Sequence, residues 1–358
     1  FKETPFYRVI GRFTDAGVEA EWKAVEGSRY FESPLLYKEN GFKEEKDALA
    51  LIEELNGKQA KVKSIVKNIT KKRAPLLFNL AELQAECSKK FKISPDETLQ
   101  VAQDLYEKKL TTYPRTDARV LSSAVAKEIG KNISRLKGFE PTADFVEHIM
   151  QKRLYANIAD TQYTDDSKVT DHYAIIPTGQ LTELSGLTSL QRAVFELIVR
   201  RFLSIFYPPA EYENVKLASS KVLKSEGYLQ VANPPKKKSF EESNARILGK
   251  NSETADSTDE NSNANGSNDE IVVNPKVMLE LADKLKAGDE IACQGYNIKF
   301  GKTSPPKRYT SGSMVLAMEN AGQLIEDEEL REQIKGSGIG TSATRAEIIQ
   351  KLVRIGYL

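Results

Sequence analysis

The stretch Leu110-Thr-Thr-Tyr-Pro-Arg-Thr-Asp-Ala-Arg-Val-Leu121 is the most informative part of this chain. Its Tyr113 follows a segment with helical periodicity and precedes Pro114, and Arg115 stands two positions later. Proline fixes the backbone locally and removes a donor, so this turn can hold a phenol and a guanidinium side by side. A phenol with a pKa of about 10 is a poor nucleophile until it is activated, and arginine binds phosphate bidentately. These residues alone leave two hypotheses open: a tyrosine that attacks a phosphodiester, or a structural turn.

Length and composition limit the classes of protein to which this chain can belong. The 358 residues suffice for two or three domains with their own cores. The chain has 52 basic and 51 acidic residues, so any nucleic-acid surface must come from local clustering of charge. Two cysteines without a Cys-x-x-Cys spacing exclude a disulfide scaffold and a cysteine zinc site. No apolar run approaches the roughly 18 residues of a membrane span, and no signal peptide opens the chain. We therefore expect no membrane partner and a cytoplasmic location.

The first part of the chain has strand patterns. Residues 5–13 and 18–25 flank Asp15-Ala16-Gly17, which predicts a hairpin. Residues 44–56 predict an amphipathic helix with Leu49, Ile52 and Leu55 on one face. Residues 58–73 hold seven Lys or Arg and no acid. The intervening valines and isoleucines predict a strand with one basic face, which either is solvated or contacts phosphate.

From about residue 75 to 206 the pattern becomes helical. Asn79 and Ser94 have the sequence context of helix N-caps, and Thr142 and Thr188 are predicted to cap two further helices. In the helix that starts at Ser94, we predict an inward face made by Leu99, Ala102, Leu105 and Tyr106. This helix leads directly to the Tyr113 turn and would act as its rigid mount.

Strand patterns return beyond residue 210, and the chain is helical again from 306. The predicted strands are Tyr212–Leu217, Tyr228–Val231, Arg246–Leu248, Glu290–Cys293 and Ile298–Phe300. Residues 251–270 hold six acids, no base and no large apolar group, so we predict a mobile surface segment. The order of β, helical and β segments predicts an α+β fold in which a helical domain is inserted into a β domain.

Four segments together are similar to the type IA DNA topoisomerases. Residues 110–121 resemble the active-site segment of that family. Asp171-His-Tyr-Ala-Ile-Ile-Pro-Thr178, Pro305-Pro-Lys-Arg-Tyr-Thr310 and Gly338-Ile-Gly-Thr-Ser-Ala-Thr-Arg-Ala-Glu-Ile-Ile349 resemble three further family segments, in family order. The Ala-Ile-Ile-Pro-Thr form is closer to the topoisomerase III branch.

The resemblance implies a fold, a reaction and a partner. The fold is a mainly β gate domain (1–73 and 208–304), interrupted by a helical tyrosine-bearing domain (74–207) and followed by the start of a helical base domain (305–358). The reaction is cleavage and rejoining of one DNA strand through a 5′-phosphotyrosine, without ATP, which allows relaxation or decatenation. The partner is DNA, preferably single-stranded, and the protein is expected to be a monomer associated with the nucleoid.

The resemblance also assigns roles to residues. Tyr113 would be the nucleophile, Arg115 the phosphate clamp and His172 an auxiliary group. The candidate contacts to the DNA backbone are Lys307, Arg308, Thr341, Ser342, Thr344 and Arg345. His172 follows Asp165, Asp166 and Asp171, and these acids would favour its protonated form. Where the topoisomerase III pattern often has a second histidine, this chain has Tyr173, so a role for that position stays in doubt.

The family holds Mg²⁺ with a glutamate and an Asp-x-Asp pair of an N-terminal Toprim domain. The sequence contains no Asp-x-Asp. It also begins at Phe1 and ends directly after a helical pattern. We therefore expect a fragment whose Mg²⁺ ligands lie outside these residues, and we expect the fragment alone to be inactive.

Other motifs are weaker. Gly295 and Gly301-Lys-Thr303 are separated by five residues where the ATP-binding loop needs four, and Gly336-Ser-Gly338-Ile-Gly340 lacks dinucleotide spacing. These glycines precede Thr344 and Glu347, which have capping-box spacing, so the helix start could meet a DNA phosphate or simply be a cap. His148 is expected to be structural.

Two rival functions remain. One is a non-catalytic module that binds single-stranded DNA. The other is a tyrosine recombinase, which would need its basic and histidine residues before the tyrosine, whereas His172 follows Tyr113.

Overall fold

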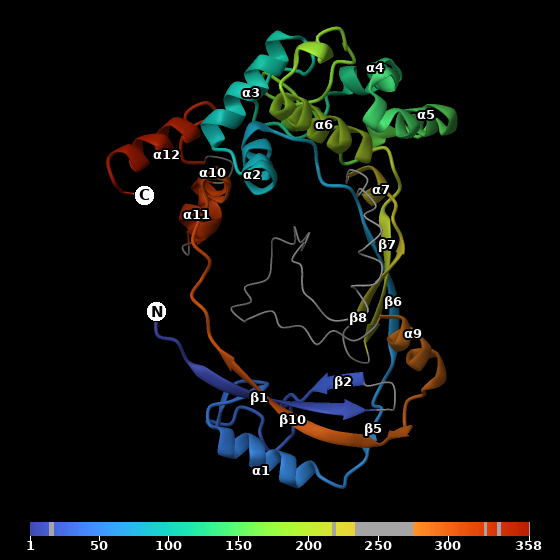
Figure 1. The fold of residues 1–358 in the computed structure, drawn as a ribbon, viewed down its shortest axis with the longest axis vertical. Helices are drawn as coiled ribbons and strands as arrows, with labels where there is room; N and C mark the ends of the chain where they lie inside the picture. Colours follow the sequence, from blue (N-terminus) through green and yellow to red (C-terminus); the bar gives the residue numbers. More distant parts are fainter. Residues whose placement is uncertain (14–17, 217–219, 233–274, 326–327, 335–337, 358) are drawn as a thin grey trace. The chain divides into compact units, whose positions relative to one another are not determined.

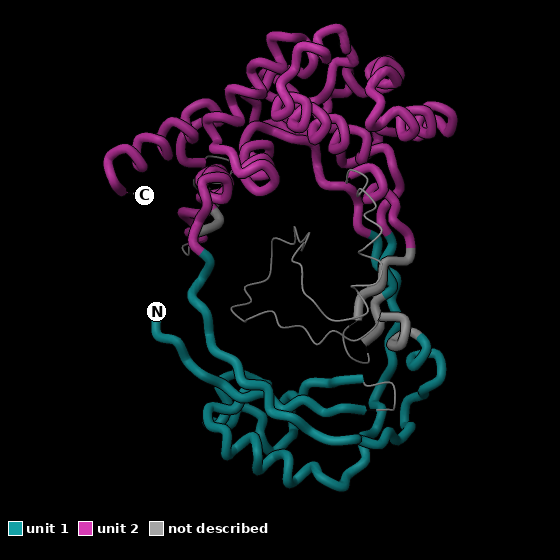
Figure 2. Tube along the Cα trace, in the orientation of Figure 1, with its two compact units in different colours: residues 1–71, 211–224, 238–307 teal, residues 72–210, 225–237, 308–358 magenta. Residues whose placement is uncertain are grey.

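A computed structural model describes residues 1–13, 18–216, 220–232, 275–325, 328–334 and 338–357. Its contacts divide the chain into two compact units (Figure 2). The first contains Phe1–Lys71, Glu211–Lys224 and Lys238–Lys307, and the second contains Lys72–Ala210, Ser225–Lys237 and Arg308–Leu358. The residues after 307 therefore cluster with the tyrosine-bearing segment.

The first unit is built on antiparallel strands (Figure 1). Its sheet has the order β10-β1-β4-β3, with β2 also paired to β1, and two smaller sheets follow the orders β5-β9 and β6-β7-β8. The elements are β1 (Pro5–Phe13), β2 (Val18–Glu21), β3 (Leu36–Lys38), β4 (Gly41–Phe42), α1 (Glu45–Leu55), β5 (Ala60–Lys61), β6 (Val66–Lys72), β7 (Ala210–Lys216), β8 (Ser220–Ser225), α9 (Pro275–Lys284), β9 (Glu290–Ile291) and β10 (Cys293–Lys302).

The core of this unit joins segments far apart in the sequence. β1 pairs along its length with β10, so that Val9 lies opposite Ile298. Val9, Phe42 and Leu51 are fully or almost fully buried in one cluster, and Trp22 stacks on Phe42 at 5.3 Å between ring centroids. Apolar burial of this kind contributes roughly 1.5–3 kcal/mol per large side chain and holds the start of the chain to residues near 300.

Most predicted elements of this unit are present, with corrections in detail. β1 and β2 pair as the hairpin prediction requires, while residues 14–17 lie outside the described residues. Helix α1 is confirmed, but its buried face is centred on Ala48 and Leu51, and Leu49 is 49% exposed. The basic strand predicted over 58–73 is two strands, β5 and β6, and six of the seven β6 residues are exposed.

The second unit is mainly helical. Its helices are α2 (Leu80–Phe91), α3 (Pro95–Glu107), α4 (Ser123–Arg135), α5 (Ala143–Lys152), α6 (Ser189–Ser204), α7 (Leu229–Ala232), α10 (Ser311–Glu319), α11 (Glu328–Ile334) and α12 (Arg345–Arg354). The described residues of this unit also form six short 3₁₀ helices: η1 (Leu136–Gly138), η2 (Glu140–Thr142), η3 (Ile158–Asp160), η4 (Asp166–Lys168), η5 (Leu184–Gly186) and η6 (Ala321–Leu324). Val315 and Met318 of α10 pack on Ala81 of α2.

Cap chemistry explains where several of these helices begin. The side chains of Asn79, Ser94 and Thr188 accept hydrogen bonds from backbone N–H groups of α2, α3 and α6, as predicted. Thr142 makes no such bond to α5, so that predicted cap is wrong. Tyr228–Val231 is also not a strand, because residues from Leu229 form the short helix α7. The predicted strand 246–248 and the segment 251–270 lie outside the described residues.

Helix α3 differs from prediction in one functionally relevant respect. Its buried face is formed by Thr98, Val101, Ala102 and Leu105. Tyr106, predicted to face inward, is 39% exposed. The helix ends at Glu107; two residues later Lys109 has a φ of 59°, in the left-handed region, and this reversal directs the chain into the Tyr113 turn.

Asn79 provides a test of this architecture. Its side-chain oxygen accepts from the Glu82 N–H at 2.9 Å, and its amide donates to the Asp117 carbonyl at 3.2 Å and to Glu319 Oε1 at 2.7 Å. We expect Asn79→Ala to lower the free energy of unfolding by about 2–3 kcal/mol, because two bonds beyond the cap are lost. Ser94→Ala, which removes only a cap bond, should cost about 1 kcal/mol. Urea unfolding measures both, and equal losses would contradict the linking role of Asn79.

Candidate active site

The Tyr113 segment and the His172 segment are paired by their backbones. The Thr112 N–H donates to the Ile176 carbonyl at 2.9 Å, and the Thr178 N–H donates to the Leu110 carbonyl at 3.0 Å. Thr111 and Pro177 form an isolated antiparallel bridge. Two stretches about 60 residues apart in the sequence therefore behave as one short ladder.

Two threonine hydroxyls reinforce this ladder. The Thr112 hydroxyl donates to the Ala174 carbonyl and accepts from the Ile176 N–H, both at 3.0 Å. The Thr116 hydroxyl donates to the carbonyl of His172 at 2.9 Å. Because each of these hydroxyls bonds the other segment, the backbones on both sides of Tyr113 are held to the backbone that carries His172.

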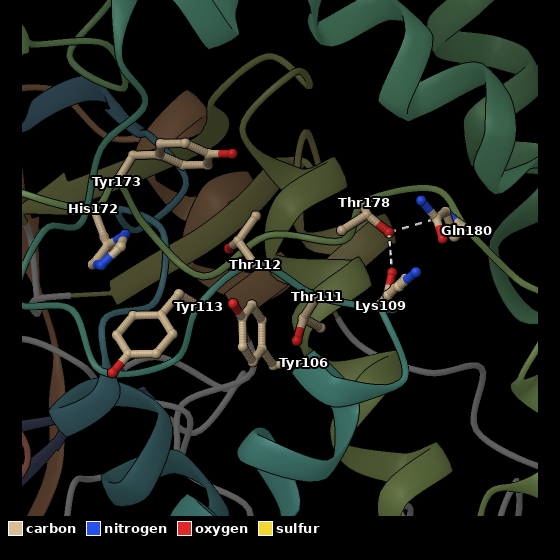
Figure 3. A pocket seen from close by; sticks show the side chains of 9 residues that line it. All are labelled: Tyr106, Lys109, Thr111, Thr112, Tyr113, His172, Tyr173, Thr178 and Gln180. Carbon is tan, nitrogen blue, oxygen red and sulfur yellow. Dashed lines mark hydrogen bonds between the residues drawn. The ribbon is translucent and has the colours of Figure 1, made fainter.

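The result is a close contact between two predicted site residues. The rings of Tyr113 and His172 are 4.5 Å apart between centroids, with 44° between their planes. Figure 3 shows the His172 imidazole beside the Tyr113 ring. Within the described part of the chain, the Tyr113 hydroxyl has no hydrogen-bond partner, so it is available to a ligand.

The two arginines of this segment have different environments. Arg119 is half-buried and forms an ion pair with Glu82 at 2.7 Å. Arg115 is exposed, and the described residues offer it no ion pair or side-chain hydrogen bond. Of the two guanidinium groups, only that of Arg115 is therefore presented to solvent without a protein anion.

Two of the three acids expected to act on His172 have other partners. The pKa of Asp165 is lowered to about 2, mainly by hydrogen bonds from Lys168 and Ser167. Asp166 accepts from the N–H of Ser123 at 2.8 Å, and this bonding to Ser123 lowers its pKa. Both carboxylates thus hold local structure by their hydrogen bonds, and neither is hydrogen-bonded to His172 among the described residues.

A pocket of about 330 Å³ opens beside Tyr113 (Figure 3). Its lining comes from the end of α3, from the Tyr113 segment and from the His172 segment: Tyr106, Lys109, Thr111, Thr112, Tyr113, His172, Tyr173, Thr178 and Gln180. Tyr106 packs edge-to-face against Tyr113, with ring centroids 5.3 Å apart. Sequence reasoning missed Tyr106 and Thr111. Tyr106 lies four residues after the buried Ala102, so helical periodicity alone assigns it to the core.

The helix start near residue 340 packs against α10. A Cβ on Gly338 would lie 2.6 Å from the Met318 carbonyl oxygen, and Gly340 has a φ of +67°. These glycines are therefore required by close approach and by a left-handed turn. Thr344 makes no cap bond to α12; instead its hydroxyl accepts from the Thr341 N–H at 2.9 Å, so the predicted capping box is wrong.

The predicted DNA contacts are placed unevenly. Lys307, Arg308, Thr341 and Thr344 are exposed, whereas Ser342 is buried. The Arg345 side chain is only 5% exposed, and its guanidinium lies 3.3 Å from Asp117 and 3.9 Å from Glu319. In this structure Arg345 faces the protein, where it ties α12 to Asp117 of the Tyr113 segment. This arrangement differs from the direct DNA contact that we predicted for it.

Among the described residues, no group of three or more His, Cys, Asp or Glu side chains is placed to hold a metal ion. The described helices include none that is long and apolar enough to cross a bilayer.

Glu319 provides a test of the Arg345 cluster. Burial raises the pKa of the Glu319 carboxyl, and the neighbouring Arg345 offsets this only in part. The contribution of the Glu319 carboxyl to the free energy of unfolding is therefore fully present below its unfolded pKa of about 4.3. It is lost as the pH rises through the higher pKa of the folded state. We expect Glu319→Gln, which keeps an acceptor for Asn79, to melt at the same or a higher temperature than wild type at pH 7. Any increase in melting temperature of Glu319→Gln over wild type should vanish near pH 4. Exposed Glu347→Gln is the control, and a clear loss for Glu319→Gln alone at pH 7 would contradict the assignment.

Comparison with known proteins identifies the family. A family model described as DNA topoisomerase matches residues 1–358. The chain is 34% identical over 318 residues to DNA topoisomerase 3 of Bacillus subtilis (strain 168), covering 84% of this chain and 38% of that protein. It is 32% identical over 325 residues to DNA topoisomerase 3 of Shouchella clausii (strain KSM-K16), covering 90% and 40%. The chain thus spans about two fifths of the length of these relatives.

A solved structure agrees at the level of fold. Full-length topoisomerase I from Thermotoga maritima matches with a TM-score of 0.55 at 20% identity, covering 100% of this chain and 48% of that one. The predicted mixture of helices and small antiparallel sheets is thereby confirmed as a topoisomerase-like fold. This chain belongs to the DNA topoisomerase family, as a type IA, topoisomerase III-like member.

Proposed function

We propose that these residues are the strand-cleaving part of a DNA topoisomerase, with Tyr113 as its nucleophile. The observation that carries the proposal is the placement of the Tyr113 ring 4.5 Å from the His172 ring. Arg115, two residues after Tyr113, is exposed and has no ion-pair partner among the described residues. The family match over all 358 residues supports this assignment.

The proposed reaction is a transesterification. The Tyr113 hydroxyl oxygen attacks a backbone phosphorus and loses its proton, while the bond from phosphorus to the 3′ oxygen breaks and that oxygen gains a proton. The strand is left with a 5′-phosphotyrosine and a free 3′ hydroxyl. Attack by that hydroxyl reverses the step, and another strand passes in the interval. The phosphotyrosine conserves the bond energy, so no ATP is needed.

Arg115 and His172 have separate roles in this proposal. The Arg115 fork binds two phosphate oxygens and stabilises the charge that develops in the transition state. His172 lies against the Tyr113 ring, where an imidazole can bind the same phosphate or exchange the tyrosine proton. Mg²⁺, held by carboxylates outside these residues, would neutralise phosphate charge when bound.

We further propose that the partner is single-stranded DNA. The exposed side chains Lys307, Arg308, Thr341 and Thr344, together with the Ser342 region, supply backbone contacts. In this proposal Arg345 acts indirectly by fixing α12 to Asp117. We also propose that the predicted gate, tyrosine and base domains are separate functional parts, with the base segment packed in the same compact unit as the tyrosine-bearing residues, and that the protein acts as a monomer on the chromosome in the cytoplasm.

The central test uses the parent topoisomerase with supercoiled plasmid and magnesium. We expect Tyr113→Phe to abolish relaxation while retaining DNA binding, because only the nucleophilic oxygen is removed. Tyr155→Phe, outside the pocket, is the control and should relax normally. Equal relaxation by Tyr113→Phe and wild type would favour the rival function, a DNA-binding module without this nucleophile.

Arg115 yields a sharper prediction. We expect Arg115→Lys to lower the cleavage rate about 10²–10³-fold relative to wild type, almost as much as Arg115→Ala does. The reason is that a point charge does not reproduce a bidentate fork. Oligonucleotide cleavage by the parent enzyme measures this loss. Cleavage by Arg115→Lys at close to the wild-type rate would show that positive charge alone suffices.

DNA preference can be measured with the 358-residue chain itself. We expect tighter binding to single-stranded than to duplex DNA of the same sequence, since a strand without a partner can expose its bases to aromatic side chains. The logarithm of the binding constant should fall with the logarithm of salt concentration by about 0.7 per neutralised phosphate. Equal affinity for duplex, or no salt dependence, would contradict this part of the proposal.

A further inference from the structure

The pocket beside Tyr113 has a feature that strand cleavage alone does not explain. The Thr111 residue that lines it is 1% exposed. Among the described residues, its Oγ1 has no hydrogen-bond partner. A buried hydroxyl without a partner costs roughly 1–3 kcal/mol, and native structures seldom leave such a group unpaired. A ligand group that enters the pocket can supply the missing bond.

Some of the other polar groups of the pocket already have hydrogen-bond partners in the protein, and others do not. The Thr112 hydroxyl is bonded to the backbone at Ala174 and Ile176. The Thr178 hydroxyl donates to the Lys109 carbonyl and accepts from the Gln180 N–H. No described residue hydrogen-bonds the side chains of Lys109 or Gln180. Together with Thr111, they leave an ammonium, an amide and a hydroxyl for a ligand.

The remaining lining is aromatic. Tyr106 and Tyr113 meet edge-to-face, His172 lies against Tyr113, and Tyr173 completes this wall. Tyr106 keeps 39% of its surface exposed. Aromatic rings beside a few hydrogen-bonding groups are how proteins hold an unstacked base. A volume of about 330 Å³ is at the lower end of ligand pockets and suits one base, not a length of strand.

We propose that this pocket receives a single nucleobase, from a nucleotide next to the phosphate that Tyr113 attacks. The base stacks on the Tyr106 ring and hydrogen-bonds the Thr111 hydroxyl, with Lys109 and Gln180 at its edge. Since Tyr113 forms one wall of the pocket, a base held there fixes which phosphate meets the tyrosine hydroxyl. The pocket is thus a specificity subsite, and this inference rests on the proposed cleavage function.

The pocket is held in shape before DNA arrives. Lys109 adopts a left-handed φ of 59°, and its carbonyl accepts the Thr178 hydroxyl. Thr178 in turn donates its N–H to Leu110. A preformed pocket loses little conformational freedom on binding, which improves discrimination between positions on the strand.

The test measures binding to short single strands that carry one abasic position each, using the parent topoisomerase with Tyr113→Phe so that no cleavage occurs. In that background, an abasic residue at one position beside the mapped cleavage site should weaken binding about tenfold. Adding Tyr106→Ala should weaken binding of the intact strand by a similar factor and make that one position indifferent to base removal. Tyr357→Ala, at an exposed tyrosine outside the pocket, should change neither.

Thr111→Val separates recognition from folding. It removes a buried hydroxyl that has no partner in the described protein, so the thermal midpoint should stay the same or rise. Affinity should fall a few-fold for the intact strand and not for the strand abasic at the same position. If the protein binds single strands but no position depends on Tyr106, the base pocket is refuted while the cleavage proposal stands. If it binds no single strand, the DNA function itself fails, and the pocket proposal fails with it.

Discussion

The hydrogen bonding of the Tyr113 segment to the His172 segment is the constraint on which the candidate site depends. Thr112 contributes most, because its hydroxyl both donates to Ala174 and accepts from Ile176. Serine or threonine hydroxyls can do both at once, so one side chain fixes two points of the opposite segment. The 4.5 Å contact between the Tyr113 and His172 rings follows from this pairing, as does the pocket beside them.

A second set of contacts attaches the later motifs to the same segment. Asp117, four residues after Tyr113, is bonded through its carbonyl to Asn79 and through its carboxylate to Arg345. Asn79 and Arg345 also contact Glu319. The cap of α2, the end of α10 and the start of α12 therefore meet at the Tyr113 turn. A nucleophile on a turn requires such support, since small displacements reduce reactivity steeply.

Much of this organisation could be predicted from the sequence. The helix N-caps at Asn79, Ser94 and Thr188 follow from local sequence preferences. The Tyr-Pro-Arg turn and the family segments indicated the candidate site residues. The errors have physical causes. Tyr106 lies next to the buried face of α3, and only Tyr113, later in the chain, gives its ring a partner. The ion pairs of Arg345 were not predicted because its anionic partners, Asp117 and Glu319, are remote in the sequence. Local patterns do not encode such long-range pairing.

The central claim is that Tyr113, rather than another tyrosine of the pocket, forms the bond to DNA. Tyr106 and Tyr173 line the same pocket and are the alternatives to Tyr113 as the nucleophile. The most direct measurement traps the covalent complex of the parent topoisomerase with a cleavable oligonucleotide, digests it and sequences the phosphonucleotide-bearing peptide by mass spectrometry. We expect the peptide that contains Thr112-Tyr113-Pro114 to carry the nucleotide, joined to Tyr113 through its 5′ phosphate. Modification of Tyr106 or Tyr173, with Tyr113 unmodified, would contradict it.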